Sequence, residues 1–313
     1  MEYTSIAVLM TCHNRKLKTL LTLESLFKQR LTSEIALSVY LVDDGSTDGT
    51  SEGVQQKYPQ VKLFSGDGSL FWNGGMRIAF SEAMKDDPDY YLWLNDDTVL
   101  APEALNTLLA TSRELFEQGE KKAIVAGSTC DPDTGVFTYG GMVQSRWWHP
   151  IYLRAVEPSD RPQPCDTMNG NFVLIPKEVV RAVGNLDPAF VHYAADYDYG
   201  WRAKQQGCKV WIAPGYIGTC PLNPKPTETP AQPLSDQLQK VSQPKGLALQ
   251  DVTLQPLEEW KVYSQRYGGL LWPIYWLLPY RRLIWMSFVA KLKGAWKIFL
   301  LEEYRMTGGF NQL

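Results

Sequence analysis

Histidine and cysteine are scarce in this chain of 313 residues, and both are scattered along it. The three histidines are His13, His149 and His192, and no two of the five cysteines form a C-x-x-C pair. An odd number of widely separated cysteines argues against a disulfide framework and against a zinc knuckle. We therefore expect a protein of a reducing compartment, the cytosol.

A long apolar run is also missing. The first apolar run, Ile6 to Met10, is too short for the core of a signal peptide and has no basic stretch before it. No uncharged run near the C-terminus reaches the ~20 residues that a membrane-spanning helix needs. The composition, 44% apolar and 21% charged, is that of a globular enzyme or binding module.

Acidic residues are absent from one region. Lys261 to Lys297 holds seven Lys and Arg residues but no Asp or Glu, in a chain whose net charge is −3. The acidic remainder argues against nucleic-acid binding, whereas basic residues among many aromatic side chains are typical of helices in a membrane interface. We expect residues 258–313 to form a helical segment with peripheral membrane contact. Packing of its aromatics on the rest of the chain or on a second subunit is the alternative.

Apolar strands alternate with helical patterns over the first 127 residues. The patterns predict strands at 5–11, 35–42, 61–64, 90–94 and 123–127, and helices at about 16–28, after 46, at 75–84 and after 102. Such alternation predicts a mostly parallel sheet with helices on both faces. Ligands bind such sheets at the carboxyl ends of the strands, so the polar residues that follow the strands are the candidate site.

The pattern changes in the second part of the chain. Hairpins are expected after residue 136, and helices near 176 and over about 196–206. The stretch from Pro221 to Pro244 has six prolines and no glycine, which predicts a linker or a surface excursion. We predict one domain over 1–220, with halves at about 1–127 and 128–220, then a Pro-rich segment at 221–257 and the helical segment at 258–313.

Two polar motifs follow the first two strands. T-C-H-N-R (Thr11–Arg15) leads into a helix, whose N-terminal N–H groups suit a phosphate, although an ordinary turn capped by Asn explains it equally well. D-D-G-S-T-D (Asp43–Asp48) offers carboxylates to a base N–H or a ribose hydroxyl. The same letters also make a good turn without any ligand.

Two further motifs contain paired carboxylates. L-N-D-D-T (Leu94–Thr98) places two acids at a strand end, and their repulsion predicts a cation, Mg²⁺ or Mn²⁺, that also holds a diphosphate. D-Y-D-Y-G-W-R (Asp196–Arg202) starts a helix with an acid that can accept the proton of a sugar hydroxyl. A helix cap with an i,i+4 ion pair from Asp198 to Arg202 explains the same residues.

These motifs in this order, together with M-N-G-N-F-V-L-I-P (Met168–Pro176), resemble the family 2 glycosyltransferases, especially the rhamnosyltransferase-like branch, over roughly residues 5–220. The segment Gly66–Arg77 is similar to the loop of that branch beneath the sugar nucleotide. The resemblance implies an α/β fold of the GT-A type, with a mostly parallel sheet flanked by helices and, here, a C-terminal helical extension rich in aromatic and basic residues.

The resemblance also implies a reaction and a place in the cell. The expected enzyme is an inverting, metal-dependent glycosyltransferase that moves a sugar from a nucleoside-diphosphate sugar, dTDP-rhamnose or a UDP-hexose, to a glycan or lipid-linked acceptor. Its product belongs to cell-surface polysaccharide synthesis. We expect a cytoplasmic protein that is peripheral on the inner face of the plasma membrane.

Site residues follow from the resemblance position by position. The donor nucleotide is expected to contact Thr11, Asn14, Arg15, Asp43 and Asp96. The donor sugar and the acceptor are expected near Trp72, Asn73, Gly74, Asn169, Gly170 and His192. Asp97 is the expected ligand of Mg²⁺ or Mn²⁺, and Asp196 is the expected catalytic base, with Asp198 as the alternative base.

Two positions depart from the family pattern. Many relatives have Glu-Asp where this chain has Ala195-Asp196, and many have a metal-binding His after the last strand, where Ala213 to Cys220 has none. These departures leave two other functions open, a sugar nucleotidyltransferase and a non-catalytic module that binds a nucleotide sugar or a membrane. A nucleotidyltransferase needs no base for a sugar hydroxyl, so the residues around Asp196 separate it from a glycosyltransferase.

Overall fold

The computed structural model describes residues 4–192, 194–222, 257–281 and 285. By its internal contacts the chain divides into two compact units, Met1–Asn223 and Pro224–Leu313. Most of the predicted Pro-rich segment, and the basic segment beyond Trp285, lie outside the described residues.

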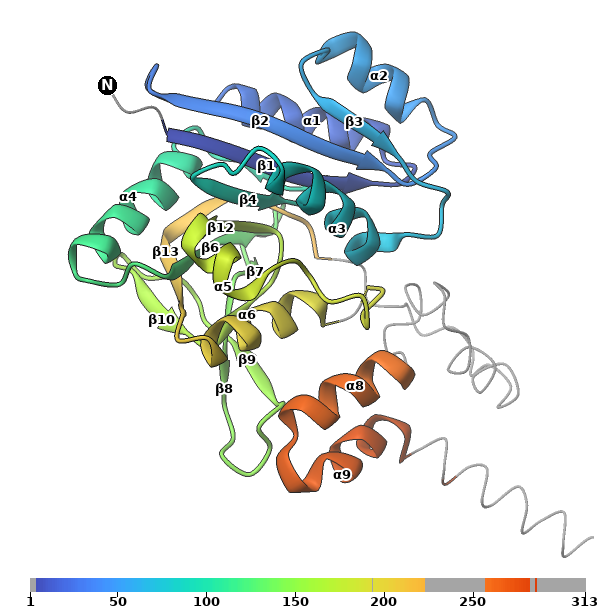
Figure 1. Cartoon of the computed structure of the whole chain (residues 1–313), viewed down its shortest axis with the longest axis vertical. Helices are drawn as coiled ribbons and strands as arrows, with labels where there is room; N and C mark the ends of the chain where they lie inside the picture. The colour runs from blue at the N-terminus through green and yellow to red at the C-terminus, as the bar shows by residue number, and fades with distance from the viewer. Residues whose placement is uncertain (1–3, 193, 223–256, 282–284, 286–313) are drawn as a thin grey trace, which may run out of the picture. The chain divides into compact units, whose positions relative to one another are not determined.

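The first unit begins with a parallel sheet whose strands follow the predicted alternation (Figure 1). The strands lie in the order β3-β2-β1-β4, and each neighbouring pair is parallel. Their bounds are β1 Thr4–Cys12, β2 Ile35–Asp43, β3 Lys62–Ser65 and β4 Tyr90–Leu94. The connecting helices are α1 Lys16–Phe27, α2 Thr50–Lys57 and α3 Phe71–Met84.

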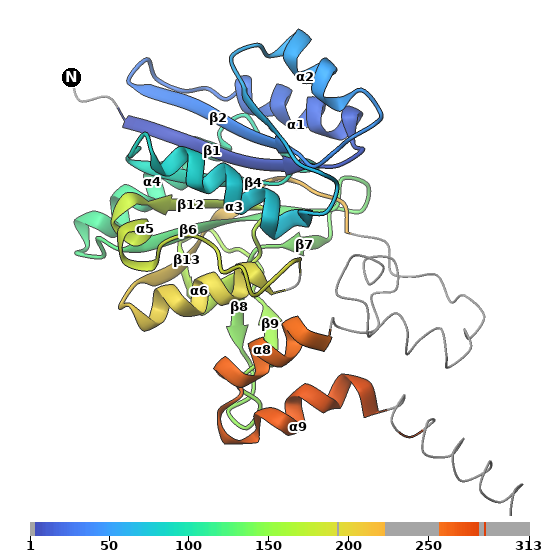
Figure 2. The same ribbon diagram turned by 45° about the vertical axis from the view of Figure 1, so that its right-hand side comes forward.

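Helices cover both faces of this sheet, which explains why its strands are apolar throughout (Figure 2). Alternate residues of β1 point to opposite faces: Ile6, Val8 and Met10 belong to the core that includes Leu23 and Leu26 of α1. On the other face, α3 packs on β1 and β2. The predicted mostly parallel α/β sheet is confirmed.

The sheet continues beyond β4 through an antiparallel strand. β12 (Phe172–Pro176) lies between β4 and β6 (Ala123–Cys130) and is antiparallel to both. β13 (Lys209–Thr219) is parallel to β6. The described residues thus form a ten-stranded sheet, in which the two expected halves of the domain share one set of hydrogen-bonded strands.

Short elements complete the first unit. α4 (Ala104–Glu117) packs on β6 and β13. The short strands at the edges and in the second, three-stranded sheet are β5 Val99–Leu100, β7 Phe137–Tyr139, β8 Gly141–Gln144, β9 Leu153–Ala155, β10 Gln163–Cys165 and β11 Thr167–Met168. The last helices are α5 Lys177–Val183 and α6 Ala195–Gln205, and α6 packs against β11.

The second unit contains a helical pair. α8 (Leu257–Tyr267) is followed by the short η2 (Gly269–Leu271), α9 (Trp272–Leu277) and η3 (Leu278–Tyr280). Two indoles join the pair: Trp260 donates to the carbonyl of Tyr275 at 3.2 Å, and Trp276 donates to that of Leu257 at 3.3 Å. Within the part of the chain that the structure describes, no helix has both the length and the apolar composition to span a bilayer.

Close contact between α3 and β1 depends on a glycine. An added Cβ at Gly75 would lie 2.1 Å from Oγ1 of Thr11, so we expect Gly75→Ala to lower the free energy of unfolding by about 1–3 kcal/mol through overpacking. Urea unfolding would measure this loss. Gly53→Ala is the matched control, because its Cβ meets Cε of the flexible Lys16 at 2.9 Å and Ala favours a helix. Equal stability of the two variants would contradict the close contact.

Candidate active site

The site forms where strand ends from distant parts of the sequence meet. β1 and β2 end side by side, with Cys12 paired to Asp43. Because β12 runs antiparallel to β4, its first residue, Phe172, pairs with Leu94, the last residue of β4. The loop before β12 therefore lies beside the L-N-D-D-T motif, and the amide of Asn95 donates to the carbonyl of Asn171 at 3.0 Å.

α3 begins four residues earlier than predicted because a distant carboxylate caps it. Asp44 accepts hydrogen bonds from the amides of Gly68, Leu70 and Phe71 at 2.8, 2.9 and 3.0 Å. Acidic side chains stabilise a helix N-terminus in this way. The segment predicted as a loop beneath the sugar nucleotide thus enters a helix at Phe71, and Trp72 lies in its first turn.

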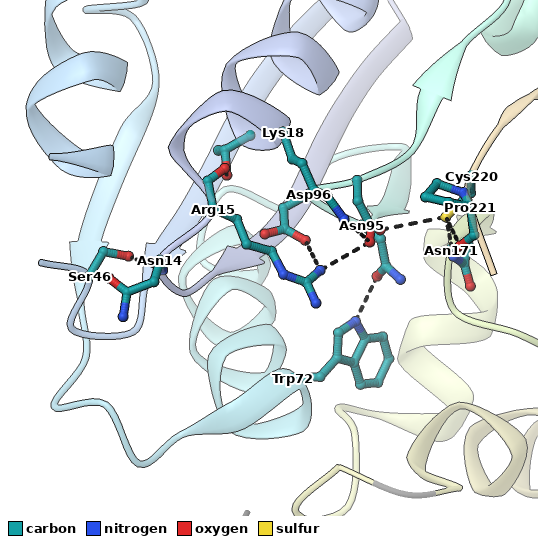
Figure 3. A network of polar contacts seen from close by, with 12 residues as sticks. Asn14, Arg15, Lys18, Ser46, Trp72, Asn95, Asp96, Asn171, Cys220 and Pro221 are labelled. Carbon is teal, nitrogen blue, oxygen red and sulfur yellow. Dashed lines mark hydrogen bonds and ion pairs between the residues drawn. The ribbon is translucent and has the colours of Figure 1, made fainter. Parts of the chain in front are cut away.

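Arg15 bridges the two carboxylates that follow β4 (Figure 3). Its NH1 lies 3.1 Å from Oδ1 of Asp96 and 3.0 Å from Oδ2 of Asp97, and Nζ of Lys18 lies 3.7 Å from the same Asp97 oxygen. Desolvation raises the pKa of Asp96 to about 6, although Arg15 acts in the opposite direction. The second oxygen of Asp96 is buried and accepts no hydrogen bond from the described residues.

Two residues that the sequence reasoning missed complete this corner. The thiol of Cys220 donates to Oδ1 of Asp97 at 3.6 Å, and Nδ2 of Asn171 donates to the same sulfur at 3.4 Å. Burial, and to a lesser extent the negative charge of Asp97, raises the pKa of the Cys220 thiol to about 12. A signal was present in the sequence, because Cys220 directly follows the last strand of the domain, where only a histidine was sought.

Trp72 links the carboxylate pair to the acceptor side of the site. Its indole N–H donates to Oδ1 of Asn95 at 2.7 Å (Figure 3). Its ring also covers Gly170, where an added Cβ would lie 2.6 Å from Cζ2 of the indole. Trp93 supports the ring edge-on, with the two centroids 5.8 Å apart.

Asp196 lies at the start of α6, next to this tryptophan and glycine. Its carboxylate accepts the amide of Gly170 at 3.0 Å and the amide of Tyr197 at 2.8 Å. Desolvation raises the pKa of Asp196 to about 6, against the effect of these two hydrogen bonds. The Asn169 side chain donates to the hydroxyl of Tyr197 at 3.0 Å. Asp196 is therefore held in one orientation and is poised to titrate near neutral pH.

Asp198 has a different environment from Asp196. It is fully buried, and its Oδ2 lies 2.7 Å from Nε of Arg202, the i,i+4 pair expected from the sequence. Arg202 also donates to the carbonyls of Val183 and Asn185 at 3.0 and 3.1 Å. This pair ties α6 to the end of α5, which favours a structural role for Asp198, while its role as the alternative base stays a prediction.

Some of the predicted ligand-binding residues hold the site together from behind. Asn73 is fully buried and donates to the carbonyls of Asp187 and Phe190, so it anchors the loop before His192 and does not line an open surface. Asp43 is also buried, and its carboxylate accepts from the amide of Ser46 at 3.0 Å and from the hydroxyl of Ser51. Both side chains thus have hydrogen-bond partners within the chain, and their contacts with a ligand stay predictions.

Three other predicted residues have different surroundings. Asn14 is exposed and joins the first two polar motifs, because its amide donates to Oγ of Ser46 at 2.8 Å and its Oδ1 accepts from the amide of Thr47 at 2.8 Å. Gly74 lies in the first turns of α3, against Leu70. Desolvation lowers the pKa of His192, and the positive charge of Arg15 lowers it further, so His192 is within electrostatic reach of Arg15.

The carboxylates that follow β4 could bind a divalent cation on two conditions. Among the described residues, no group of three or more His, Cys, Asp or Glu side chains could hold a metal ion unaided. Mg²⁺ and Mn²⁺, however, are commonly held by one or two carboxylates together with a substrate diphosphate. The unpaired oxygen of Asp96 and the carboxylate of Asp97 suit that arrangement, provided that a diphosphate supplies ligands and Arg15 moves.

Two solved structures have a similar fold. A crystal structure of S. aureus TarS 1-349 in complex with UDP-GlcNAc is 13% identical, with a TM-score of 0.53 over 84% of this chain and 66% of that one. A crystal structure of GalNAc-T7 with UDP, GalNAc and Mn²⁺ is 17% identical, with a TM-score of 0.55 over 80% and 53%. These likenesses show the fold, and the chain has the predicted GT-A architecture.

The family follows from the sequence match. The model described as glycosyl transferase family 2 matches residues 7–179, which is more than half of the chain, so the chain belongs to that family. N-acetylglucosaminyl-diphospho-decaprenol L-rhamnosyltransferase of Mycobacterium tuberculosis, from two strains, is 26% identical over 208 residues, or 58% of this chain. The match spans 65% of the length of these curated relatives.

The buried pair in α6 gives a prediction that separates the two acids. Asp198→Ala should destabilise the fold by about 3–5 kcal/mol, because it leaves the Arg202 guanidinium without its carboxylate, while turnover per folded molecule stays within a few-fold of wild type. Thermal unfolding and rates normalised to folded protein measure the two effects. Lys204→Ala, which removes a more exposed pair with Asp166, is the control and should cost at most about 1 kcal/mol. Normal unfolding with a large loss of turnover would instead make Asp198 the base.

Proposed function

We propose that this chain is an inverting glycosyltransferase that moves a sugar from a nucleoside-diphosphate sugar to a hydroxyl of a lipid-linked saccharide. One observation carries the proposal. The carboxylate of Asp196 is fixed by two backbone amides beside Gly170, and the same glycine packs on Trp72, whose indole binds the residue before the Asp96–Asp97 pair. The proposed catalytic base, Asp196, and the proposed diphosphate-binding pair, Asp96 and Asp97, are thus connected by direct contacts through Gly170 and Trp72.

In the proposed reaction the acceptor oxygen attacks the anomeric carbon, and its proton passes to Asp196. The bond between that carbon and the diphosphate oxygen breaks, and the nucleoside diphosphate leaves. A pKa of about 6 suits this role, because Asp196 is then largely ionised at neutral pH but still basic enough to accept a proton. The sugar configuration inverts, since attack and departure occur on opposite faces.

The opposite corner is assigned to the leaving group. Arg15 and Lys18 carry positive charge next to the end of β4, where the diphosphate of a donor would meet the N-terminus of α1. Asp97 would hold Mg²⁺ or Mn²⁺, and this ion would supply charge that stabilises the departing diphosphate. Asp96 would accept a hydrogen bond from the donor ribose, and its buried Oδ2, which has no hydrogen-bond partner among the described residues, supports this role.

The comparisons support a choice of substrates to test first. The curated relatives are described as rhamnosyltransferases that act on N-acetylglucosaminyl-diphospho-decaprenol. We propose dTDP-rhamnose as the donor and a prenyl-diphosphate-linked sugar as the acceptor, in the synthesis of a cell-surface polysaccharide. UDP-hexoses form the second set of donors.

A donor panel tests this function directly. dTDP-rhamnose and UDP-hexoses would be incubated with the chain, with and without Mn²⁺ and with and without an acceptor that carries a short prenyl diphosphate. Release of a nucleoside diphosphate that increases with acceptor supports glycosyl transfer. Release of pyrophosphate would indicate a nucleotidyltransferase, and binding without turnover would indicate a non-catalytic module.

Asp196→Asn gives the sharpest test of the base. We expect turnover to fall about 10² to 10⁴-fold, with donor affinity retained, because the variant cannot take the acceptor proton. For the wild type, turnover should decline as the pH falls through about 6, since protonation removes the base. The residual rate of the variant should lack this decline. A variant that keeps near-normal turnover and unfolds normally would reject the assignment.

The second unit carries an exposed apolar ridge, which supports the proposal of peripheral membrane contact. Leu270 is 98% exposed, and Leu271, Ile274 and Leu277 are exposed as well, at spacings that place them along one side of η2 and α9. The absence of acidic residues from Lys261 to Lys297 makes an anionic lipid surface the complementary partner. Lipid-linked acceptors lie in such a surface.

Replacing the ridge should weaken membrane binding. We expect Leu270→Ser with Ile274→Ser to lower the affinity for phosphatidylglycerol vesicles by about tenfold or more, because two apolar side chains no longer enter the interface. Vesicle co-sedimentation measures this. Val136→Ser, which changes a 60% exposed apolar residue of the first unit, is the matched control and should bind as wild type. Unchanged binding of the double variant would contradict the ridge as the contact.

A further inference from the structure

Arg15 lies between Asp96 and the proposed metal ligand, Asp97. A single guanidinium nitrogen, NH1, contacts both Asp96 and Asp97, at 3.1 and 3.0 Å. We propose that Arg15 and the divalent cation compete for this pair, so that metal binds firmly only after a nucleoside diphosphate has drawn Arg15 away. This inference rests on the proposed use of a metal ion and a nucleoside-diphosphate donor.

The charges around the pair explain the competition. Both carboxylate side chains are only 8% exposed, so the charges around them interact more strongly than in open solvent. Arg15 and Lys18 bring two positive charges to the two negative ones, and the four groups together are neutral. The guanidinium of Arg15 already contacts the carboxylate that a divalent cation would bind. Its positive charge would therefore repel the cation.

A diphosphate changes this balance. It adds at least two negative charges, and its oxygens match the planar fork of a guanidinium better than two separate carboxylates do. The Arg15 side chain is 42% exposed, so it can turn toward a ligand without unpacking the core. Arg15 is also the N-cap residue of α1, at the helix end that favours anions.

Asp96 gives a second sign that Arg15 does not complete the site. Its Oδ2 atom is buried and without a hydrogen-bond partner among the described residues, although Oδ1 contacts Arg15. A buried acceptor without a partner is costly, so a group supplied by a ligand is expected to meet it. When nucleotide and metal bind together, new contacts to Asp96 would therefore offset the loss of its hydrogen bond from Arg15.

The inference is tested by the binding of Mn²⁺ alone, measured from the free-ion signal in electron paramagnetic resonance. The wild type should bind Mn²⁺ at least about tenfold more tightly with UDP or dTDP than without. Arg15→Gln should bind Mn²⁺ alone at least about tenfold more tightly than the wild type, because a positive charge close to the ion is removed. An Arg15→Gln variant that binds Mn²⁺ no more tightly than the wild type would overturn the inference.

Two controls locate the effect. Arg30→Gln removes an exposed arginine that pairs with Glu103 at 3.4 Å, and it should leave Mn²⁺ binding unchanged. Asp97→Asn added to Arg15→Gln should abolish the gain in Mn²⁺ affinity, since the carboxylate that is proposed to bind the ion is lost. If a gain survives without Asp97, the ion binds elsewhere and the inference is wrong.

Arg15→Lys provides a second test, which does not depend on the stability of Arg15→Gln. Lysine retains the positive charge, so it should keep Mn²⁺ affinity low in the absence of nucleotide. A lysine variant that binds Mn²⁺ as tightly as the glutamine variant would overturn competition by charge. Thermal unfolding of each variant shows whether the compared proteins are folded.

The outcomes distinguish this inference from the proposed function. Full donor turnover in the presence of a metal chelator would refute metal use, and with it the competition, but would leave glycosyl transfer intact. The competition would be supported, and the transferase refuted, if Arg15→Gln bound Mn²⁺ more tightly while the wild type turned over no donor.

Discussion

The position of one indole ring controls the geometry of the site. Trp72 donates to Asn95 on the side of the carboxylate pair, and its ring lies on Gly170 on the side of Asp196. The spacing between these two corners is thus the width of one rigid aromatic side chain. Gly170 has no freedom to become another residue, because any Cβ at that position would enter the ring.

Two acids within one turn of α6 show how burial and partners assign different roles to the same residue type. Asp198 lies in the interior, with a guanidinium at 2.7 Å, and stabilises the joint between two helices. Among the described residues, the Asp196 carboxylate accepts from the backbone amides of Gly170 and Tyr197 and from no cation, and desolvation raises its pKa to about 6. A stabilising partner at Asp196 would remove the basicity that proton transfer requires.

Local features of the sequence predicted most of the fold, whereas several contacts in the candidate site depend on residues far apart in the chain. The apolar strands and the polar motifs after them are signals within short windows, and they appear where expected. Asp44 could not be identified as the cap of α3, because it lies 27 residues before Phe71. The contact of Cys220 with Asp97 spans 123 residues and depends on where β13 ends. Burial of Asn73 likewise depends on a loop that is distant in sequence.

The reversed direction of β12 constrains how such a protein can be recombined. A chimera joined at residue 127 would separate β12 from β4 and β6, and would cut through the middle of a continuous sheet. Exchange of acceptor-side sequence between relatives is compatible with the fold only where both ends of the exchanged piece leave the same region of the sheet. The stretch from the end of β6 to the start of β11 does not meet this condition, because its strands β7 and β10 pair with β6 and β13 of the same sheet.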